Sequence, residues 1–130
     1  FMKSGFGTEE AEIMTAKSVA KAGESEFQTG FVISFSEAKA MTAAEFDQSE
    51  LFKFASEHIA EYGYILRYPG GKEAITGFDY NPFTFRFVGD PEIAKYIMDN
   101  NITLEEYNDY VQIQISSAEQ TIERLKTDEN

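Results

Sequence analysis

The stretch from Asp47 to Gly63 constrains the fold more than any other part of the sequence. Its apolar and aromatic side chains recur at steps of three and four, which is the spacing of one face of an α-helix. Gly63 then suits a helix C-cap, and Tyr64–Tyr68 (YILRY) reads as a strand that ends at a Pro-Gly-Gly turn. A helix followed at once by a strand indicates a mixed α and β fold.

Stretches on either side of this unit also have recognisable periods. Thr8–Ala16 predicts a short helix, and the continuous apolar run Gly30–Phe35 predicts a strand buried on both faces. Thr84–Val88 alternates and predicts another strand, and Pro91 opens a helix that runs to about Asn100. The order of these elements predicts an α+β fold with a small, mainly antiparallel sheet flanked by helices.

The last part of the chain predicts a long helix. Thr103 and Glu106 have the spacing of a capping box, and apolar residues then recur at steps of three and four as far as Leu125. Val111–Ile115 (VQIQI) also alternates as a short strand would, so the pattern leaves both structures open there. Packing on its own domain or on a partner helix, from a second copy or another protein, would cover this apolar stripe.

Composition narrows the function. The 130 residues suffice for one domain with a core, and a net charge of −12 argues against nucleic acid and against an anionic membrane surface. The chain has no cysteine, which excludes disulfides and cysteine-bound zinc. It shows no apolar run long enough to span a bilayer and no signal peptide. Because it begins at Phe1, we expect a fragment that lacks its N-terminal part.

Three segments resemble the zinc D-alanyl-D-alanine carboxypeptidases of the VanY type. They are GESEFQTGFVIS, YGYILRYPGGKEAITGFDYNPFTFRFVG and ITLEEY, and together they cover roughly residues 7–110. The resemblance implies a hedgehog/D-Ala-D-Ala peptidase-like fold and a zinc site on an antiparallel sheet. It also implies that zinc-bound water and a glutamate base release the terminal D-alanine of cell-wall peptides.

Each position that the resemblance assigns to the zinc site carries another residue. Phe27 stands at the first histidine ligand, Ser34 at the aspartate ligand, Asn81 at the glutamate base and Thr84 at the second histidine ligand. A phenyl ring cannot bind a metal, and neutral hydroxyl and amide oxygens suit zinc poorly. We therefore expect these four positions to be vestigial, with no catalytic residue, metal or cofactor, and we expect Phe27 to plug the former site.

These substitutions predict a non-catalytic member of the family, a pseudoenzyme that binds a peptidoglycan stem peptide or a protein partner. Ser25, Gln28 and Arg86 are the candidate binding residues, because they match retained positions of the family pattern. The alternative is an active cell-wall hydrolase that uses other residues. The single histidine, His58, lies at no ligand position and is expected to be structural.

The remaining expectations concern organisation and place. We expect a peptidase-like domain over residues 1–110 and a helical extension over residues 111–130, through which the chain could self-associate. No nucleic acid is expected as a partner. The family resemblance implies the bacterial cell envelope or an extracellular location.

Overall fold

A computed structural model describes residues 8–20, 23–36 and 39–128. The helices are α1 (Thr8–Ser18), α2 (Ala43–Asp47), α3 (Glu50–His58), α4 (Glu73–Thr76), α5 (Pro91–Asp99) and α6 (Leu104–Asp128). The strands are β1 (Val32–Ser34), β2 (Tyr64–Tyr68) and β3 (Asn81–Phe87). The described residues also form the 3₁₀ helices η2 (Glu26–Thr29) and η3 (Ile59–Tyr62). The α+β prediction is confirmed.

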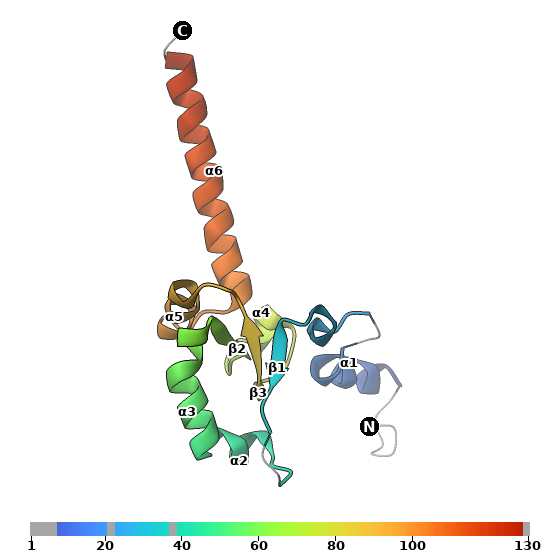
Figure 1. Ribbon diagram of the computed structural model, residues 1–130. Helices are drawn as coiled ribbons and strands as arrows, with labels where there is room; N and C mark the ends of the chain where they lie inside the picture. Colours follow the sequence, from blue (N-terminus) through green and yellow to red (C-terminus); the bar gives the residue numbers. More distant parts are fainter. Residues whose placement is uncertain (1–7, 21–22, 37–38, 129–130) are drawn as a thin grey trace.

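The sheet has three antiparallel strands in the order β1-β3-β2, so β3 lies in the middle (Figure 1). Ser34 pairs with Thr84 across β1 and β3, and Leu66 pairs with Phe85 across β2 and β3. The register shifts between Leu66 and Tyr68, which is a bulge near the end of β2. β3 begins at Asn81, earlier than its alternating pattern predicts, because Tyr68 pairs with this residue.

Two apolar clusters hold the helices to the sheet. In the first, Phe85 of β3 is fully buried against Ala55 and Ile59. In the second, Ile65 of β2 packs with Ala94 and Ile97 of α5. Burial of apolar area of this kind is the main stabilising contribution in a domain of this size.

Side-chain caps fix where the helices begin. Thr42 forms a capping box with Glu45 at α2, and Ser49 caps α3 by accepting a hydrogen bond from the Phe52 amide. The helix predicted from Asp47 to Tyr62 is therefore divided, since Ser49 starts a new helix and the last turn is 3₁₀. Gly63 ends this unit at φ +79°, as predicted.

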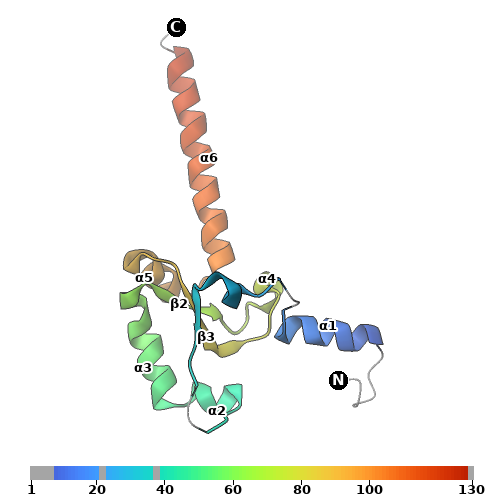
Figure 2. The same ribbon diagram turned by 45° about the vertical axis from the view of Figure 1, so that its right-hand side comes forward.

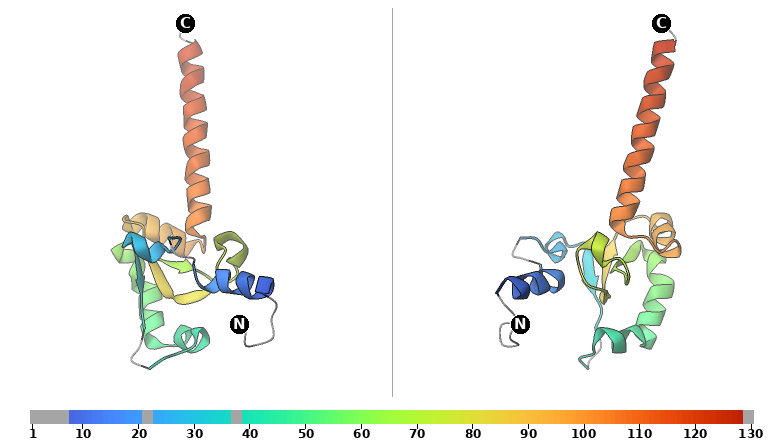
Figure 3. Two further views of the ribbon diagram at one scale, coloured as in Figure 1. Left: turned by 90° about the vertical axis from the view of Figure 1, so that its right-hand side faces the viewer. Right: turned by 180° about the vertical axis from the view of Figure 1, so that it is seen from behind.

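The predicted capping box of the last helix is confirmed. The Thr103 amide donates to Glu106 Oε2 at 2.8 Å, and the Glu106 amide donates to Thr103 Oγ1 at 3.1 Å. α6 then runs for 25 residues without a break, so the region Val111–Ile115 is helical and not a strand. Its distal part extends away from the rest of the molecule in each view (Figures 1, 2 and 3). No helix among the described residues is long and apolar enough to cross a membrane.

Candidate functional site

The sheet register brings together two of the four predicted ligand positions. Ser34 and Thr84 are paired across β1 and β3, and Asn81 lies at the start of β3. Phe27 lies on η2, which comes shortly before β1 in the sequence. The structure thus places Ser34 and Thr84 directly opposite each other.

The side chains at these positions differ in environment. Thr84 is 2% exposed, whereas Phe27 is 53% exposed. Asn81 Oδ1 accepts a hydrogen bond from the Phe83 amide at 2.9 Å, and in the described part of the chain no hydrogen bond joins the side chains of Ser34, Asn81 and Thr84. The expected plug is therefore wrong, because a ring with half of its surface in solvent does not fill a closed site.

The four residues do not fit a zinc ion. Zinc in proteins is held by thiolate, imidazole and carboxylate groups, and these positions offer a phenyl ring, two hydroxyls and an amide. Among residues 8–20, 23–36 and 39–128, no group of three or more His, Cys, Asp or Glu side chains is placed to hold a metal.

A buried ion-pair cluster lies beside this region. Arg67 of β2 is 6% exposed and donates to Glu26 Oε1 at 2.6 Å and to Glu105 Oε1 at 2.6 Å. Arg67 Nε donates to Glu26 Oε2 at 3.0 Å, so two guanidinium nitrogens bind the two carboxylate oxygens and the pair is bidentate. The cluster joins η2, β2 and the first turn of α6, which are far apart in the sequence.

Glu26 also binds the second arginine of the region. Arg86 Nη1 donates to Glu26 Oε2 at 3.1 Å, and Arg86 Nε donates to the carbonyl of Phe87 at 3.2 Å. Burial opposes ionisation of Glu26, but hydrogen bonds and attraction from Arg67 and Arg86 outweigh it and lower the pKa of this carboxyl. Burial likewise opposes the charge of Arg67, and Glu26 and Glu105 more than offset it, so the pKa of Arg67 is raised.

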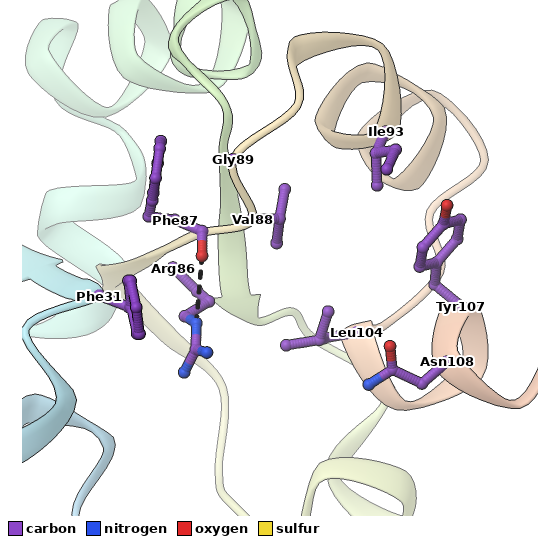
Figure 4. A pocket seen from close by; sticks show the side chains of 9 residues that line it. All are labelled: Phe31, Arg86, Phe87, Val88, Gly89, Ile93, Leu104, Tyr107 and Asn108. Carbon is purple, nitrogen blue, oxygen red and sulfur yellow. Dashed lines mark hydrogen bonds between the residues drawn. The ribbon is translucent and has the colours of Figure 1, made fainter. Parts of the chain in front are cut away.

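A pocket of about 410 Å³ opens next to Arg86, between β3, α5 and the base of α6. Phe31, Val88, Ile93 and Leu104 give it apolar walls. Arg86, Tyr107 and Asn108 contribute polar groups, and Figure 4 shows the α6 side chains across the pocket from Phe31. The Arg86 guanidinium carbon lies 5.2 Å from the centre of the Phe31 ring. This cation–π contact helps to hold the guanidinium against the ring.

The other two candidate binding residues lie outside the lining of this pocket. The Ser25 hydroxyl caps η2 by accepting a hydrogen bond from the Phe27 amide at 3.3 Å. Gln28 is exposed on η2. Both residues lie on or next to the turn that carries Glu26, and Arg86 alone of the three candidates lines the pocket.

Comparison with known proteins shows the family. The family model described as "VanY: D-alanyl-D-alanine carboxypeptidase" matches residues 2–90. The chain belongs to the VanY family.

Individual relatives agree with this family assignment. The bifunctional D-Ala-D-Ala dipeptidase and carboxypeptidase VanXYC of Enterococcus gallinarum is 38% identical over 101 residues, which cover 75% of this chain and 53% of the relative. The solved structure of VanYB in complex with D-alanine-D-alanine is 29% identical, with a TM-score of 0.69, and the match covers 83% of this chain and 57% of that one.

A second solved structure holds the metal. The VanY D,D-pentapeptidase from the VanB-type resistance cassette, in complex with Zn(II), is 30% identical, with a TM-score of 0.67 over 82% of this chain and 57% of that one. The chain spans only 31% to 53% of the length of the curated relatives that it matches.

The prediction that the chain is not an enzyme is contradicted by these comparisons. The relatives and structural neighbours that it matches are named as D-Ala-D-Ala carboxypeptidases and dipeptidases. The inference rested on substitutions at four positions, and a substitution pattern alone does not establish the loss of an activity that the family carries. We therefore treat the chain as a member of a peptidase family.

Sequence reasoning missed the acidic side of the ion-pair cluster. It gave Glu105 no role and assigned Glu106 only to a helix cap, but Glu105 binds Arg67 and Glu106 also binds Lys72 at 2.9 Å. Glu26 went unassigned although it lies within the retained motif. Its partner Arg67 is 41 positions away, so sequence spacing gives no signal for the pair.

Proposed function

We propose that this VanY-family chain recognises cell-wall peptides that end in D-Ala-D-Ala, and that Arg86 binds their terminal carboxylate. The printed names of the relatives concern D-Ala-D-Ala peptides, and the solved VanYB complex holds D-alanine-D-alanine itself. The single observation that carries the proposal is an arginine in the wall of a mostly apolar pocket.

The pocket suits a short peptide with small side chains. Its volume of about 410 Å³ lies within the range of about 300–1,000 Å³ that is usual for small-molecule sites. The apolar walls from Val88, Ile93 and Leu104 offer contacts for methyl groups. Tyr107 and Asn108 add hydrogen-bonding groups next to them.

Arg86 has donor capacity left for a carboxylate. Its Nη1 and Nε atoms bind Glu26 and the Phe87 carbonyl, while Nη2 has no hydrogen bond among the described residues. Arg67 and Arg86 balance the charges of Glu26 and Glu105, so the cluster itself does not repel an anion. Ser25, by capping η2, acts as a positioning residue for Glu26, and Gln28 is offered to the peptide from the exposed side of η2.

The zinc positions are a second part of the proposal. We infer that Phe27, Ser34, Asn81 and Thr84 stand where the family's ligands and base stand and do not bind zinc themselves. Any hydrolysis by this chain would then use other groups. A calorimetric zinc titration should give no tight site, and one zinc per chain at micromolar affinity or better would contradict this inference.

The peptide proposal is tested by isothermal titration of a pentapeptide ending in D-Ala-D-Ala. The Arg86→Gln variant should bind at least about tenfold more weakly, because a hydrogen bond to a charged group contributes roughly 1.5–3 kcal/mol. Lys53→Gln removes one positive charge from the surface of α3 and should bind as the wild type does. Equal affinity of all three proteins, or no binding at all, would contradict the proposal.

We place this function at the cell envelope or outside the cell. The reason is that the substrates named for the relatives, D-Ala-D-Ala peptides, belong to the bacterial cell wall. Secretion of the full-length protein in its native host, followed by fractionation, is the direct measurement. Recovery in the cytoplasm would argue against this placement.

A further inference from the structure

We propose that Asn108 of α6 binds the terminal carboxylate of the ligand together with Arg86, so that two walls of the pocket hold this group. The inference rests on the function proposed above and deepens it. It assigns a binding role to a residue that lies outside residues 2–90, the part of the chain that the family model matches.

Arg86 and Asn108 each bring an unused donor to the same pocket. Arg86 comes from β3 and Asn108 from the second turn of α6, and both line the cavity of about 410 Å³. Arg86 Nη2 and the carboxamide of Asn108 have no hydrogen bond among the described residues. In Figure 4 the Asn108 side chain extends from α6 toward the side of the pocket where Arg86 lies. Both donors are therefore available to a ligand in this pocket.

The size of the pocket lets one carboxylate reach both donors. A volume of about 410 Å³ is that of a cube with an edge of about 7 Å. A carboxylate has two oxygens, and each accepts hydrogen bonds of about 2.9 Å, so one carboxylate can join donors that are up to about 8 Å apart. Donors on two walls of a pocket of this size therefore lie within reach of a single carboxylate.

The charges around the pocket favour an anion there. None of the described residues that line it is acidic, although the whole chain has a net charge of −12. The acids of the neighbouring ion pairs are already neutralised, since Glu105 binds Arg67, Glu106 binds Lys72 and Glu26 binds two arginines. A carboxylate that enters the pocket therefore meets a guanidinium and an amide, and no acidic side chain in the wall opposes it.

Tyr107 also brings a polar group to the α6 wall, but its hydroxyl is directed elsewhere. In Figure 4 this hydroxyl points to the end of the pocket where Ile93 lies, away from Arg86. The centre of the Tyr107 ring lies 6.1 Å from that of Tyr96, so the ring packs against α5. The carboxylate contact is therefore assigned to Asn108 and not to Tyr107.

The test is isothermal titration of a pentapeptide ending in D-Ala-D-Ala, as the free acid and as the C-terminal amide. The ratio of the two affinities measures the contribution of the carboxylate, whereas a purely structural defect lowers both affinities alike and leaves the ratio unchanged. The wild type should bind the acid at least about tenfold more tightly, because hydrogen bonds to a charged group are strong. Asn108→Ala should lower this ratio about fivefold or more, because one of these hydrogen bonds is lost.

Two further variants separate the lost donor from a general effect on α6. Asn108→Asp has the same size, lacks the donor and adds a negative charge, so its acid-to-amide ratio should fall below that of Asn108→Ala. Gln112→Ala is the matched control, since Gln112 carries the same carboxamide one turn further along α6, is exposed and lies outside the pocket lining. Its ratio should equal that of the wild type.

The outcomes distinguish this inference from the proposed function. A wild-type ratio in Asn108→Ala, or the same fall of the ratio in Gln112→Ala, would overturn the role of Asn108 and leave the proposed function in place. Equal binding of acid and amide by the wild type would overturn the proposed contact of Arg86 with the carboxylate, and this inference with it.

Discussion

At the scale of single residues, Arg67 is the group on which most of the site depends. Its guanidinium is almost fully buried and holds two carboxylates from segments that no sequence pattern connects. A buried charge of this kind is tolerated because its donors are satisfied, and it becomes costly when one partner is lost. Glu26 matters doubly, since it also holds Arg86 at the pocket.

Replacement of Glu26 should therefore destabilise the fold. We expect Glu26→Gln to lower the free energy of unfolding by about 3 kcal/mol at pH 7, because it leaves Arg67 buried with one carboxylate. Glu50→Gln is the control, since the Glu50 side chain is 93% exposed and its pair with Lys53 should contribute less than about 0.5 kcal/mol. Urea unfolding measures both, and similar losses in the two variants would contradict the role of Glu26.

The ion pairs of Glu26 with Arg67 and Arg86 predict that the stability of the fold depends on pH. The pKa of folded Glu26 lies below its ordinary value of 4.5, so the stabilisation from its charge is fully present above about pH 4.5. It is lost as the pH falls through the lower pKa of the folded state. The stability difference between wild type and Glu26→Gln should therefore shrink from pH 5 to pH 3 in urea unfolding, and a constant difference would refute the linkage.

What the sequence could predict at this scale is limited to positions in a motif. It placed Ser34 and Thr84 in one site, and the register pairs them. It could not give the exposure of Phe27 or the partners of Arg67, because both depend on how distant segments pack. The inference from four substitutions to a non-enzyme was wrong because residue identity at a few positions does not determine the activity of a family member.

At the scale of elements, short-range chemistry was predictable and tertiary pairing was not. The capping box at Thr103 and the glycine cap at Gly63 were read from local spacing and are present. The division of the helix at Ser49 and the early start of β3 were missed. The second of these depends on pairing with β2, which local spacing does not report.

Two glycines with the same backbone angle should respond differently to substitution. Gly63 and Gly71 have φ of +79° and +78°, so alanine at either costs about 1–2 kcal/mol in backbone strain. At Gly63 a Cβ would also lie 3.0 Å from the Gly89 carbonyl oxygen, whereas Gly71 has open space. The Gly63→Ala variant should unfold at a clearly lower urea concentration than the Gly71→Ala variant. Equal unfolding midpoints would contradict the prediction, because they would mean that the contact with Gly89 does not affect stability.

At the scale of the whole molecule, the chain divides into a packed domain and a projecting helix. The two core clusters and the residues that line the pocket all precede Val111, although α6 itself is continuous there. We propose that the boundary expected from the sequence between residues 110 and 111 is a boundary in packing that lies within one continuous helix.

Removal of residues 111–130 tests that boundary. The shortened chain should still fold, with a change in unfolding free energy of less than about 1 kcal/mol, because the deleted residues are mostly exposed. It should also keep the wild-type affinity for a D-Ala-D-Ala peptide, because every residue that lines the pocket is retained. Loss of cooperative thermal unfolding would mean that the distal helix is part of the domain.

The central claim is that this VanY-family chain recognises the D-alanyl end of cell-wall peptides. The most direct measurement is a calorimetric titration with two pentapeptides that differ only in ending in D-Ala-D-Ala or L-Ala-L-Ala, with free D-alanine assayed in the same samples. The account predicts saturable binding of the D-terminated peptide and weaker binding of the other, whether or not D-alanine is released. Equal binding of both peptides, or no heat and no release with either, would contradict it.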